Sequence, residues 1–294
     1  MSEPDFPSAL AASRVPAVWL QRSAAAPSQS KLGGLPDLAD QIPWPAHRES
    51  GQPLHFLAQI DLSELPATPL PGTPAEMRLP PTGMLYFFAD IGEEMLWGED
   101  TGEDAPKNSR VLFANEAGPP RAPPPELPLI AGSYGRGIRV FPEAKLIAHA
   151  IDSFWGARKS FPDAFSHAAD LEMIASIHRA VGELPLITSD KVDADWLALG
   201  KHSAAFFQRV YSTGTKDEKE PWIVRHQMLG APASVQNAAD DAKENGDLLL
   251  LQIDTDQAVH EDFKFCDLGM VQFWMHPSDL EVGRFERAWA TTEG

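Results

Sequence analysis

The sequence predicts an α+β protein whose mainly antiparallel β-sheets are internally duplicated and carry peripheral helices. The first observation is a repeated apolar run: residues 56–61 read Phe-Leu-Ala-Gln-Ile-Asp, and residues 249–254 read Leu-Leu-Leu-Gln-Ile-Asp. The second is a later pair, in which Gly-Met-Leu-Tyr-Phe-Phe at residues 83–88 is answered by Gly-Met-Val-Gln-Phe-Trp at residues 269–274. Because both blocks recur in the same order, we expect two related halves.

A third block indicates where each half begins. Leu-Gly-Gly-Leu-Pro at residues 32–36 is echoed by Leu-Gly-Ala-Pro at residues 229–232. A chain of 294 residues is long enough for one large domain or for two intimately packed halves, and we expect a single globular domain over residues 1–294. Its predicted parts are a first repeat unit at 28–115, a connecting region with a Pro-rich strap and helices at 116–222, and a second repeat unit at 223–294.

Each repeated block has the character of a β-strand. A short apolar run bounded by turn signals is typical of a strand that is buried on both faces. Successive side chains of a strand point to opposite faces, so Gln59 and Asp61 share one face, as do Gln252 and Asp254. A glycine opens the second run of each half, as a turn with positive φ requires.

The polar residues at the strand ends allow two interpretations. In one, the two Gln/Asp pairs face each other across a pseudo-twofold axis and form a polar site. In the other, they secure the main chain: Asp61 precedes Glu64 by three positions and Asp254 precedes Gln257 in the same way, which is the pattern of a capping box. We expect the second arrangement, with a short capped helix after each strand and the glutamines bonded to buried backbone groups.

The remaining chain gives weaker signals. Residues 7–26 are rich in alanine and predict one or two short helices packed by Val18, Trp19 and Leu20. Prolines crowd residues 118–128, which is typical of a stiff extended strap or, alternatively, of a proline-rich recognition ligand. The other expected elements are strands at 110–114, 139–141 and 145–151, helices at 163–181 and 195–211, a polar helix or loop at 237–246, and a terminal helix that begins at the capping box 278–281 and carries Val282, Phe285 and Trp289 on one side.

Composition excludes several classes of partner. The 24 basic and 42 acidic residues give a net charge of −18, which argues against a nucleic-acid backbone or an anionic membrane and permits a basic protein partner. Cys266 is the single cysteine, so neither an intramolecular disulfide nor a multi-cysteine metal site is expected. The N-terminus is acidic and the chain has no apolar run of about 18 residues, so we expect a cytoplasmic protein.

Catalytic and metal-binding motifs occur in the sequence only as incomplete patterns. Residues 131–135, Ala-Gly-Ser-Tyr-Gly, are one residue short of a nucleophile elbow, and a poor helix former follows. His260-Glu261 resembles the start of a zinc-protease helix, but Lys264 stands where the second histidine belongs. We therefore expect neither a metal nor a cofactor.

Two further residues have a structural and a functional interpretation. His149 could form half of a metal site with Asp152, but its apolar neighbours predict a strand and a histidine satisfied in the core. Trp44 follows the same logic, since packing is the default role of a tryptophan beside apolar residues.

The repeated blocks resemble the YwqG-like family of bacterial proteins. The resemblance implies an α+β fold with an internally duplicated, mainly antiparallel sheet arrangement, and it carries no catalytic residues. Some members of that family are similar to proteins encoded beside bacterial toxins, which implies a neutralising role toward a partner. The matching residues are 32–36, 44–45, 56–61, 79–88, 229–232, 235–236, 250–254, 269–274 and 285–289.

Two functions from different classes follow. The first is a non-catalytic protein-interaction module, with a basic toxin or another basic protein as the partner. The alternative is a small-molecule-binding protein or enzyme with its site in the cleft between the two repeats; whether the chain is an enzyme stays open at this point. The candidate ligand-binding residues are Trp44, Gln59, Asp61, His149, Gln252 and Asp254.

Overall fold

The computed structural model describes most of the strands that the sequence predicts. The described residues are 6–23, 27–67, 78–92, 106–130, 137–155, 224–233, 238–266 and 269–293, together with part of 169–181.

Ten strands form one sheet in which every ladder between the described strands is antiparallel. Their order is β10-β9-β8-β7-β1-β6-β2-β3-β4-β5. The strands are β1 (Arg14–Arg22), β2 (Lys31–Leu32), β3 (His55–Asp61), β4 (Met84–Ala89), β5 (Ser109–Ala114), β6 (Ala144–Phe154), β7 (Gln227–Met228), β8 (Leu248–Asp254), β9 (Met270–Met275) and β10 (Trp289–Glu293).

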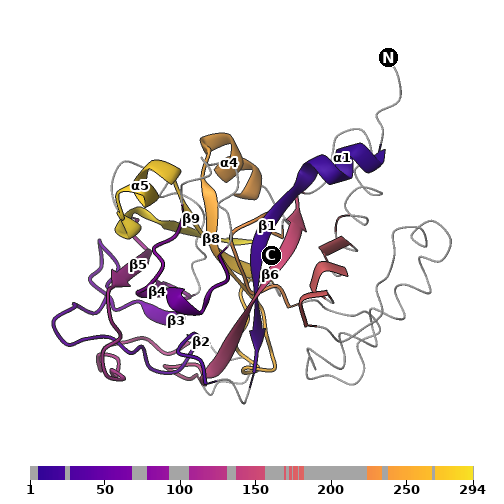
Figure 1. The fold of residues 1–294 in the computed structure, drawn as a ribbon. Helices are drawn as coiled ribbons and strands as arrows, with labels where there is room; N and C mark the ends of the chain where they lie inside the picture. The colour runs from indigo at the N-terminus through magenta and orange to yellow at the C-terminus, as the bar shows by residue number, and fades with distance from the viewer. Residues whose placement is uncertain are drawn as a thin grey trace.

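Helices are few and short among the described residues (Figure 1). Residues within 169–181 are also helical and pack beside the β1–β6 pair. The α-helices are α1 (Phe6–Ser13), α4 (Ala238–Asn245) and α5 (Pro277–Glu281), and the 3-10 helices are η1 (Leu62–Glu64) and η3 (Phe285–Arg287).

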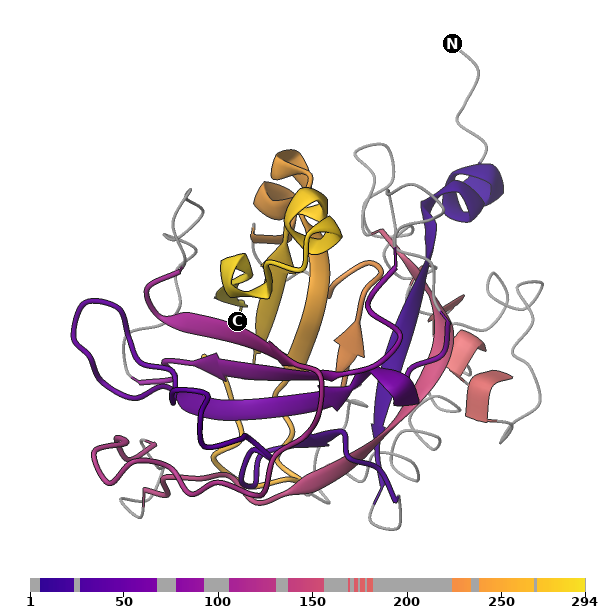
Figure 2. The same ribbon diagram turned by 60° about the vertical axis from the view of Figure 1, so that its left-hand side comes forward.

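The sheet curls into a nearly closed barrel. Its two edge strands, β5 and β10, contact each other, and η3 packs against β5. Figure 2 shows the violet strands β3 and β4 crossing in front of the orange and yellow strands β8 and β9. Inside the curl the apolar residues of both sides meet: the rings of Phe87 and Phe273 lie 5.1 Å apart in an edge-to-face arrangement. This interior is a packed core, and burial of its apolar surface drives the closure.

The β1–β6 pair is the seam between two sets of four strands. β1 and β6 pair along nearly their whole length, from Arg14 opposite Phe154 to Arg22 opposite Leu146. We call β2–β5 the first flank, which bonds to β6, and β7–β10 the second flank, which bonds to β1. β1 therefore carries the flank that is distant from it along the sequence, whereas β6 carries the flank that is nearer to it.

The two flanks share their register in detail. In the first flank the β3–β4 ladder shifts between Phe56 and Ala58, and Gln59 then lies opposite Tyr86. The β8–β9 ladder of the second flank shifts at the same place, between Leu249 and Leu251, with Gln252 opposite Gln272. A bulge re-aims the side chains that follow it, so it fixes which face both glutamines occupy.

The turn that follows β2 and β7 repeats as well. Gly33 and Gly34 have φ of 55° and 69°, and Leu229 and Gly230 have φ of 60° and 74°. Glycine is required at Gly230 because a Cβ there would lie 2.4 Å from the Oγ of Ser153. Two successive residues with positive φ turn the chain back across the sheet in both flanks.

The outer face of each flank is covered by a different element. Loop residues cover the first flank, where Leu38 and Trp44 pack on Phe88 and its neighbours. On the second flank Ala242 of α4 packs on Trp274. These covers bury the strands on both faces, as the continuous apolar runs predicted.

Several expected elements are confirmed. Strands form at 110–114 and 145–151, within β5 and β6, and the polar segment 237–246 contains α4. The expected helix at 163–181 is seen in its described part. The expected helix at 195–211 and the elbow-like residues 131–135 lie outside the described residues.

Other expectations are wrong, and each error has a physical reason. Val18, Trp19 and Leu20 belong to strand β1, because pairing on both edges outweighs the helix preference of the preceding alanines. Residues 139–141 form no strand. The terminal helix stops at Glu281, and Trp289 instead pairs with Trp274 at the start of β10.

Candidate functional site

Gln59 is fully buried and bonds to the main chain on both sides of β2. Its Oε1 accepts the N–H of Asp37 at 2.9 Å, and its Nε2 donates to the carbonyl of Gln29 at 2.9 Å. The same amide also donates to the Asp37 carboxylate at 2.7 Å. A single side chain therefore links the backbone that precedes β2 to the backbone that follows it.

Gln252 makes the corresponding bonds in the second flank. Its Oε1 accepts the N–H of Ala233 at 2.9 Å, and its Nε2 donates to the carbonyl of Arg225 at 2.8 Å. We call these two arrangements the first and second glutamine latches. The prediction that the glutamines bond to backbone groups is confirmed, but these groups belong to residues that are half-buried or, at Gln29, exposed.

The neighbouring strand supports each latch with a different side chain. The hydroxyl of Tyr86 donates to the carbonyl of Asp37 at 2.6 Å, and Nε2 of Gln272 donates to the carbonyl of Ala233 at 2.7 Å. Burial raises the pKa of Tyr86 to about 12, so this hydroxyl keeps its proton and acts as the donor.

The latches differ in charge. In the first, the buried Nζ of Lys31 lies 3.2 Å from the Asp37 carboxylate and 3.1 Å from that of Glu143. In the second, Gln227 occupies the position of Lys31 opposite the latch glutamine. Its Nε2 donates to the carbonyls of Leu229 and Ala231 at 2.7 and 2.8 Å. One latch is thus built on ion pairs and the other on neutral bonds.

Asp61 caps η1 as predicted. Its Oδ1 accepts the N–H of Ser63 at 2.9 Å. The predicted return bond from Glu64 is wrong, because this carboxylate faces the chain before β2 and accepts the N–H groups of Gln29 and Ser30 at 2.7 and 3.1 Å. Burial tends to raise the pKa of Glu64, but these bonds and those from nearby hydroxyls outweigh it and lower the pKa.

Asp254 does not cap a helix, so that prediction is wrong. The residues after it form turns, and its Oδ2 accepts the N–H of Arg225 at 2.8 Å. Its Oδ1 is buried and has no hydrogen-bond partner. Burial raises the pKa of Asp254 to about 7, which is expected for a carboxylate whose charge is only partly compensated.

The sequence did not single out a second polar cluster around His226 and Asp256. Nδ1 of His226 accepts the N–H of Asp254 at 3.2 Å, so the ring proton lies on Nε2, which is 3.3 Å from Oδ2 of Asp256. Burial alone would raise the pKa of Asp256, but the hydrogen bond from His226 and the charge of Arg22 lower it. The only signal in the sequence was the proximity of Asp256 to Asp254.

The side chains of this cluster make their hydrogen bonds and ion pair within the protein itself. Both ring nitrogens of His226 are occupied, one by a backbone amide and one by a carboxylate, so neither is available to take a proton from a substrate. Arg22 of β1 is paired with Asp256, which fastens the turns after β8 to the seam.

The other two candidates lie apart from the latches. Trp44 donates from Nε1 to the carbonyl of Leu54 at 3.0 Å and borders a void of about 10 Å³, which is room for about one water molecule. Nε2 of His149 lies 2.9 Å from Oε1 of Gln21, and burial lowers the pKa of His149. The predicted strand and a side-chain partner for His149 are confirmed, but the ring is half-buried and does not lie in the core.

The structure does not bring the six candidates together at one place. Gln59 and Asp61 are on β3, whereas Gln252 and Asp254 are on β8, and four strands separate β3 from β8 in the sheet. Their assignment as ligand-binding residues stays a prediction.

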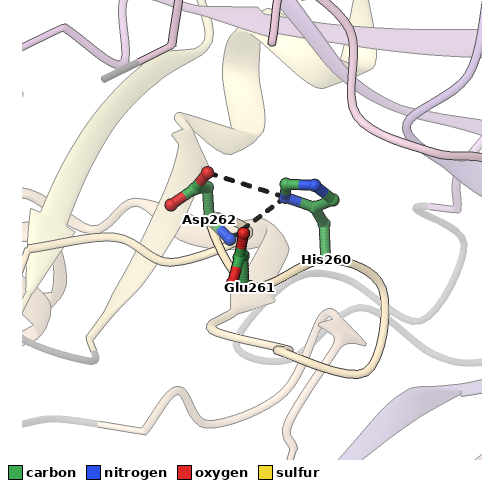
Figure 3. A group of neighbouring side chains, drawn as sticks. All are labelled: His260, Glu261 and Asp262. Carbon is green, nitrogen blue, oxygen red and sulfur yellow. Dashed lines mark hydrogen bonds and ion pairs between the residues drawn. The ribbon is translucent and has the colours of Figure 1, made fainter. Parts of the chain in front are cut away.

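His260, Glu261 and Asp262 form a local group of possible metal ligands (Figure 3). Nδ1 of His260 accepts the N–H of Asp262 at 3.1 Å and lies 3.8 Å from its carboxylate. The lone pair that would bind a metal at Nδ1 is therefore engaged by a backbone amide. We interpret this group as a side-chain-stabilised turn.

Taken together, these residues define a barrel-like antiparallel β protein whose buried polar side chains are bonded to its own main chain. The chain belongs to the family described as "Domain of unknown function (DUF1963)", which matches residues 30–293. No curated protein matches the chain. Among the described residues, no helix has the length and apolar character needed to cross a bilayer.

Proposed function

We propose that this protein is a non-catalytic module that binds a basic protein, and that its two flanks are copies of one unit. The observation that carries the proposal is the role of Gln59 and Gln252. Both glutamines, which the sequence offered for a polar site, use their side-chain oxygen and nitrogen to bond to backbone groups. Such residues stabilise a scaffold and have little capacity left for substrate.

The duplication is supported by bonds that repeat between non-identical side chains. The N–H of Asp61 donates to Oγ of Ser30, and the N–H of Asp254 donates to Nδ1 of His226. A serine and a histidine at equivalent positions accept the corresponding backbone N–H, which a chance similarity between two short sequences would not explain. On this proposal residues 1–294 form one domain, and the resemblance to the YwqG-like family concerns both flanks.

The proposed basic partner follows from charge. A net charge of −18 creates a negative potential that attracts a cationic protein and speeds its association, most strongly at low salt. A basic toxin is one example of such a cationic protein. The cytoplasmic location stays a prediction.

The test begins with recovery of a partner on the tagged full-length chain from native lysate at low ionic strength. We expect one basic protein in stoichiometric amount, whose association rate with the purified chain falls as salt is raised. Recovery of no partner at any salt concentration would contradict the proposal, as would a rate that salt does not change.

A charge variant makes the test specific. Replacing four exposed glutamates by glutamine should slow association, whereas replacing the same four by aspartate keeps the charge and should leave the rate unchanged. These residues are Glu116, Glu126, Glu261 and Glu281.

A further inference from the structure

A hollow of about 420 Å³ lies where β1, β6 and the helical residues within 169–181 meet. Figure 1 shows these helical residues beside β6. The volume is within the range of about 300–1,000 Å³ that small-molecule sites occupy. Small or compact side chains form most of its wall. The apolar lining residues are Pro16, Ala17, Ala67, Ala150, Ile151 and Ala180.

The lining of the hollow also contains three polar residues, Asp152, Ser176 and Arg179. Oγ of Ser176 accepts the N–H of Asp152 at 2.7 Å, which fixes the helical residues against β6. Nε of Arg14 donates to Oδ1 of Asp152 at 2.9 Å. Arg179 is less tightly held, because its Nη2 lies 3.9 Å from Oδ2 of Asp152, beyond hydrogen-bond distance.

The charges around Asp152 favour an anion, although Arg14 is not itself part of the lining. Arg14 and Arg179 supply two positive charges against the single negative charge of Asp152, although the chain as a whole carries −18. A guanidinium presents a planar fork that matches a carboxylate. A phosphate monoester would bring up to about two negative charges beside Asp152, so one excess positive charge suits a carboxylate better.

We propose that this hollow binds a small carboxylate with a short apolar body. The carboxylate pairs with Arg179, and the apolar body lies against Ala150 and Ile151. Binding of a small carboxylate is a second function, separate from the proposed binding of a basic protein. Its site is beside the β1–β6 seam and not at the predicted glutamines and aspartates.

Calorimetric titration of the full-length chain with hexanoate, hexan-1-ol and hexylammonium tests the chemistry. We expect saturable binding of hexanoate, with binding of the alcohol and the ammonium weaker by about tenfold or more, since a charge-assisted pair is lost. Equal binding of hexanoate and hexan-1-ol would overturn the proposal, and so would the absence of saturable hexanoate binding at millimolar concentration.

Two variants locate the site. Arg179→Gln should weaken hexanoate binding about tenfold, whereas Arg284→Gln should not change it. Arg284 is a suitable control because it is similarly exposed, at 47% against 44%, and is also paired with an aspartate. Full affinity in Arg179→Gln would overturn the assignment.

Filling the hollow is the second test. Ala150 is exposed on β6, so Ala150→Leu should fold with an unchanged circular dichroism spectrum and abolish hexanoate binding. A folded Ala150→Leu variant that binds hexanoate normally would place the ligand elsewhere.

Discussion

The two flanks perform the same structural task with different chemistry. In both flanks, a buried glutamine bonds to the backbone before and after a two-residue strand, which is β2 in the first flank and β7 in the second. The first flank surrounds it with Lys31, Asp37 and Glu143, and the second places Gln227 and Ala233 at the positions of Lys31 and Asp37. The comparison teaches that the geometry of the backbone bonds is the shared feature, whereas the charges around them differ.

Removing each latch glutamine should have the largest effect. We expect Gln59→Leu and Gln252→Leu each to lower the free energy of unfolding by about 2–3 kcal/mol, because each removes two hydrogen bonds between a fully buried side chain and the backbone. Urea unfolding of both variants measures this. Gln52→Leu, at an exposed site, should stay within about 0.5 kcal/mol of the parent. A near-neutral result at only one glutamine would break the comparison between flanks.

Converting the first latch to the composition of the second is the next test. Asp37→Ala should cost about 2 kcal/mol, because Lys31 stays buried and keeps only the half-exposed Glu143 as its partner. Adding Lys31→Gln should restore about 1 kcal/mol or more by removing that charge. A double-mutant cycle gives the coupling. If the double variant is less stable than Asp37→Ala alone, the two latches are not interchangeable.

Asp254 should make the second flank sensitive to pH. Folding raises the pKa of this carboxyl from 3.8 to about 7, so the stability that comes with its bound proton is present below about pH 4 and is lost as pH rises to about 7. At pH 8 we expect Asp254→Asn to be more stable than the parent by about 1–2 kcal/mol, because it removes a buried charge. Thermal unfolding from pH 4 to pH 8 measures the difference.

Asp61→Asn is the matched control in the first flank. Asparagine is as good a cap as aspartate, so this change should alter stability by less than about 0.5 kcal/mol. Between pH 4 and pH 7 the parent should lose stability relative to Asp254→Asn. If the difference in stability between the two proteins does not change over this range, the account of Asp254 is contradicted.

Glu64 should give a smaller effect of opposite sign. Folding lowers its pKa, so its stabilising contribution is present above about pH 4.5 and is lost as pH falls through the folded pKa. We expect Glu64→Gln to cost about 1 kcal/mol at neutral pH, since charge-assisted bonds become neutral ones, and to cost less in acid. Chemical unfolding at pH 7 and pH 3 tests this, with Glu116→Gln at an exposed position as the control. A cost that does not change with pH would contradict the role of the charge.

The strands were predictable because their signal is local. The runs that end at Asp61 and Asp254 are continuous and apolar, and a strand buried on both faces needs nothing else. Helix ends were less predictable. The same Asp-x-x-Glu/Gln pattern occurs after both strands, yet only Asp61 caps a helical turn, because Asp254 is drawn to the backbone of Arg225 instead.

The polar clusters show the limit of sequence reasoning. Gln59 and Gln252 could be recognised as polar residues in buried runs, and their backbone role followed from the cost of an unpaired amide. His226, Asp256 and Arg22 are far apart or unremarkable along the chain and become partners only when β1 packs beside β7. The hollow at the seam is equally non-local, since Ala150 and Arg179 meet only through packing.

By itself, the sequence determined the two sets of buried strands, the glycine-containing turns that precede them and the net charge of −18. These properties depend on residue type and on spacing within about ten positions. Long-range packing fixed three further features: β1 joins the second flank and β6 the first, the sheet curls until β5 meets β10, and particular carboxylates are paired. Those outcomes depend on contacts between segments distant in sequence, whose energies are set by burial and by partners that no local pattern specifies.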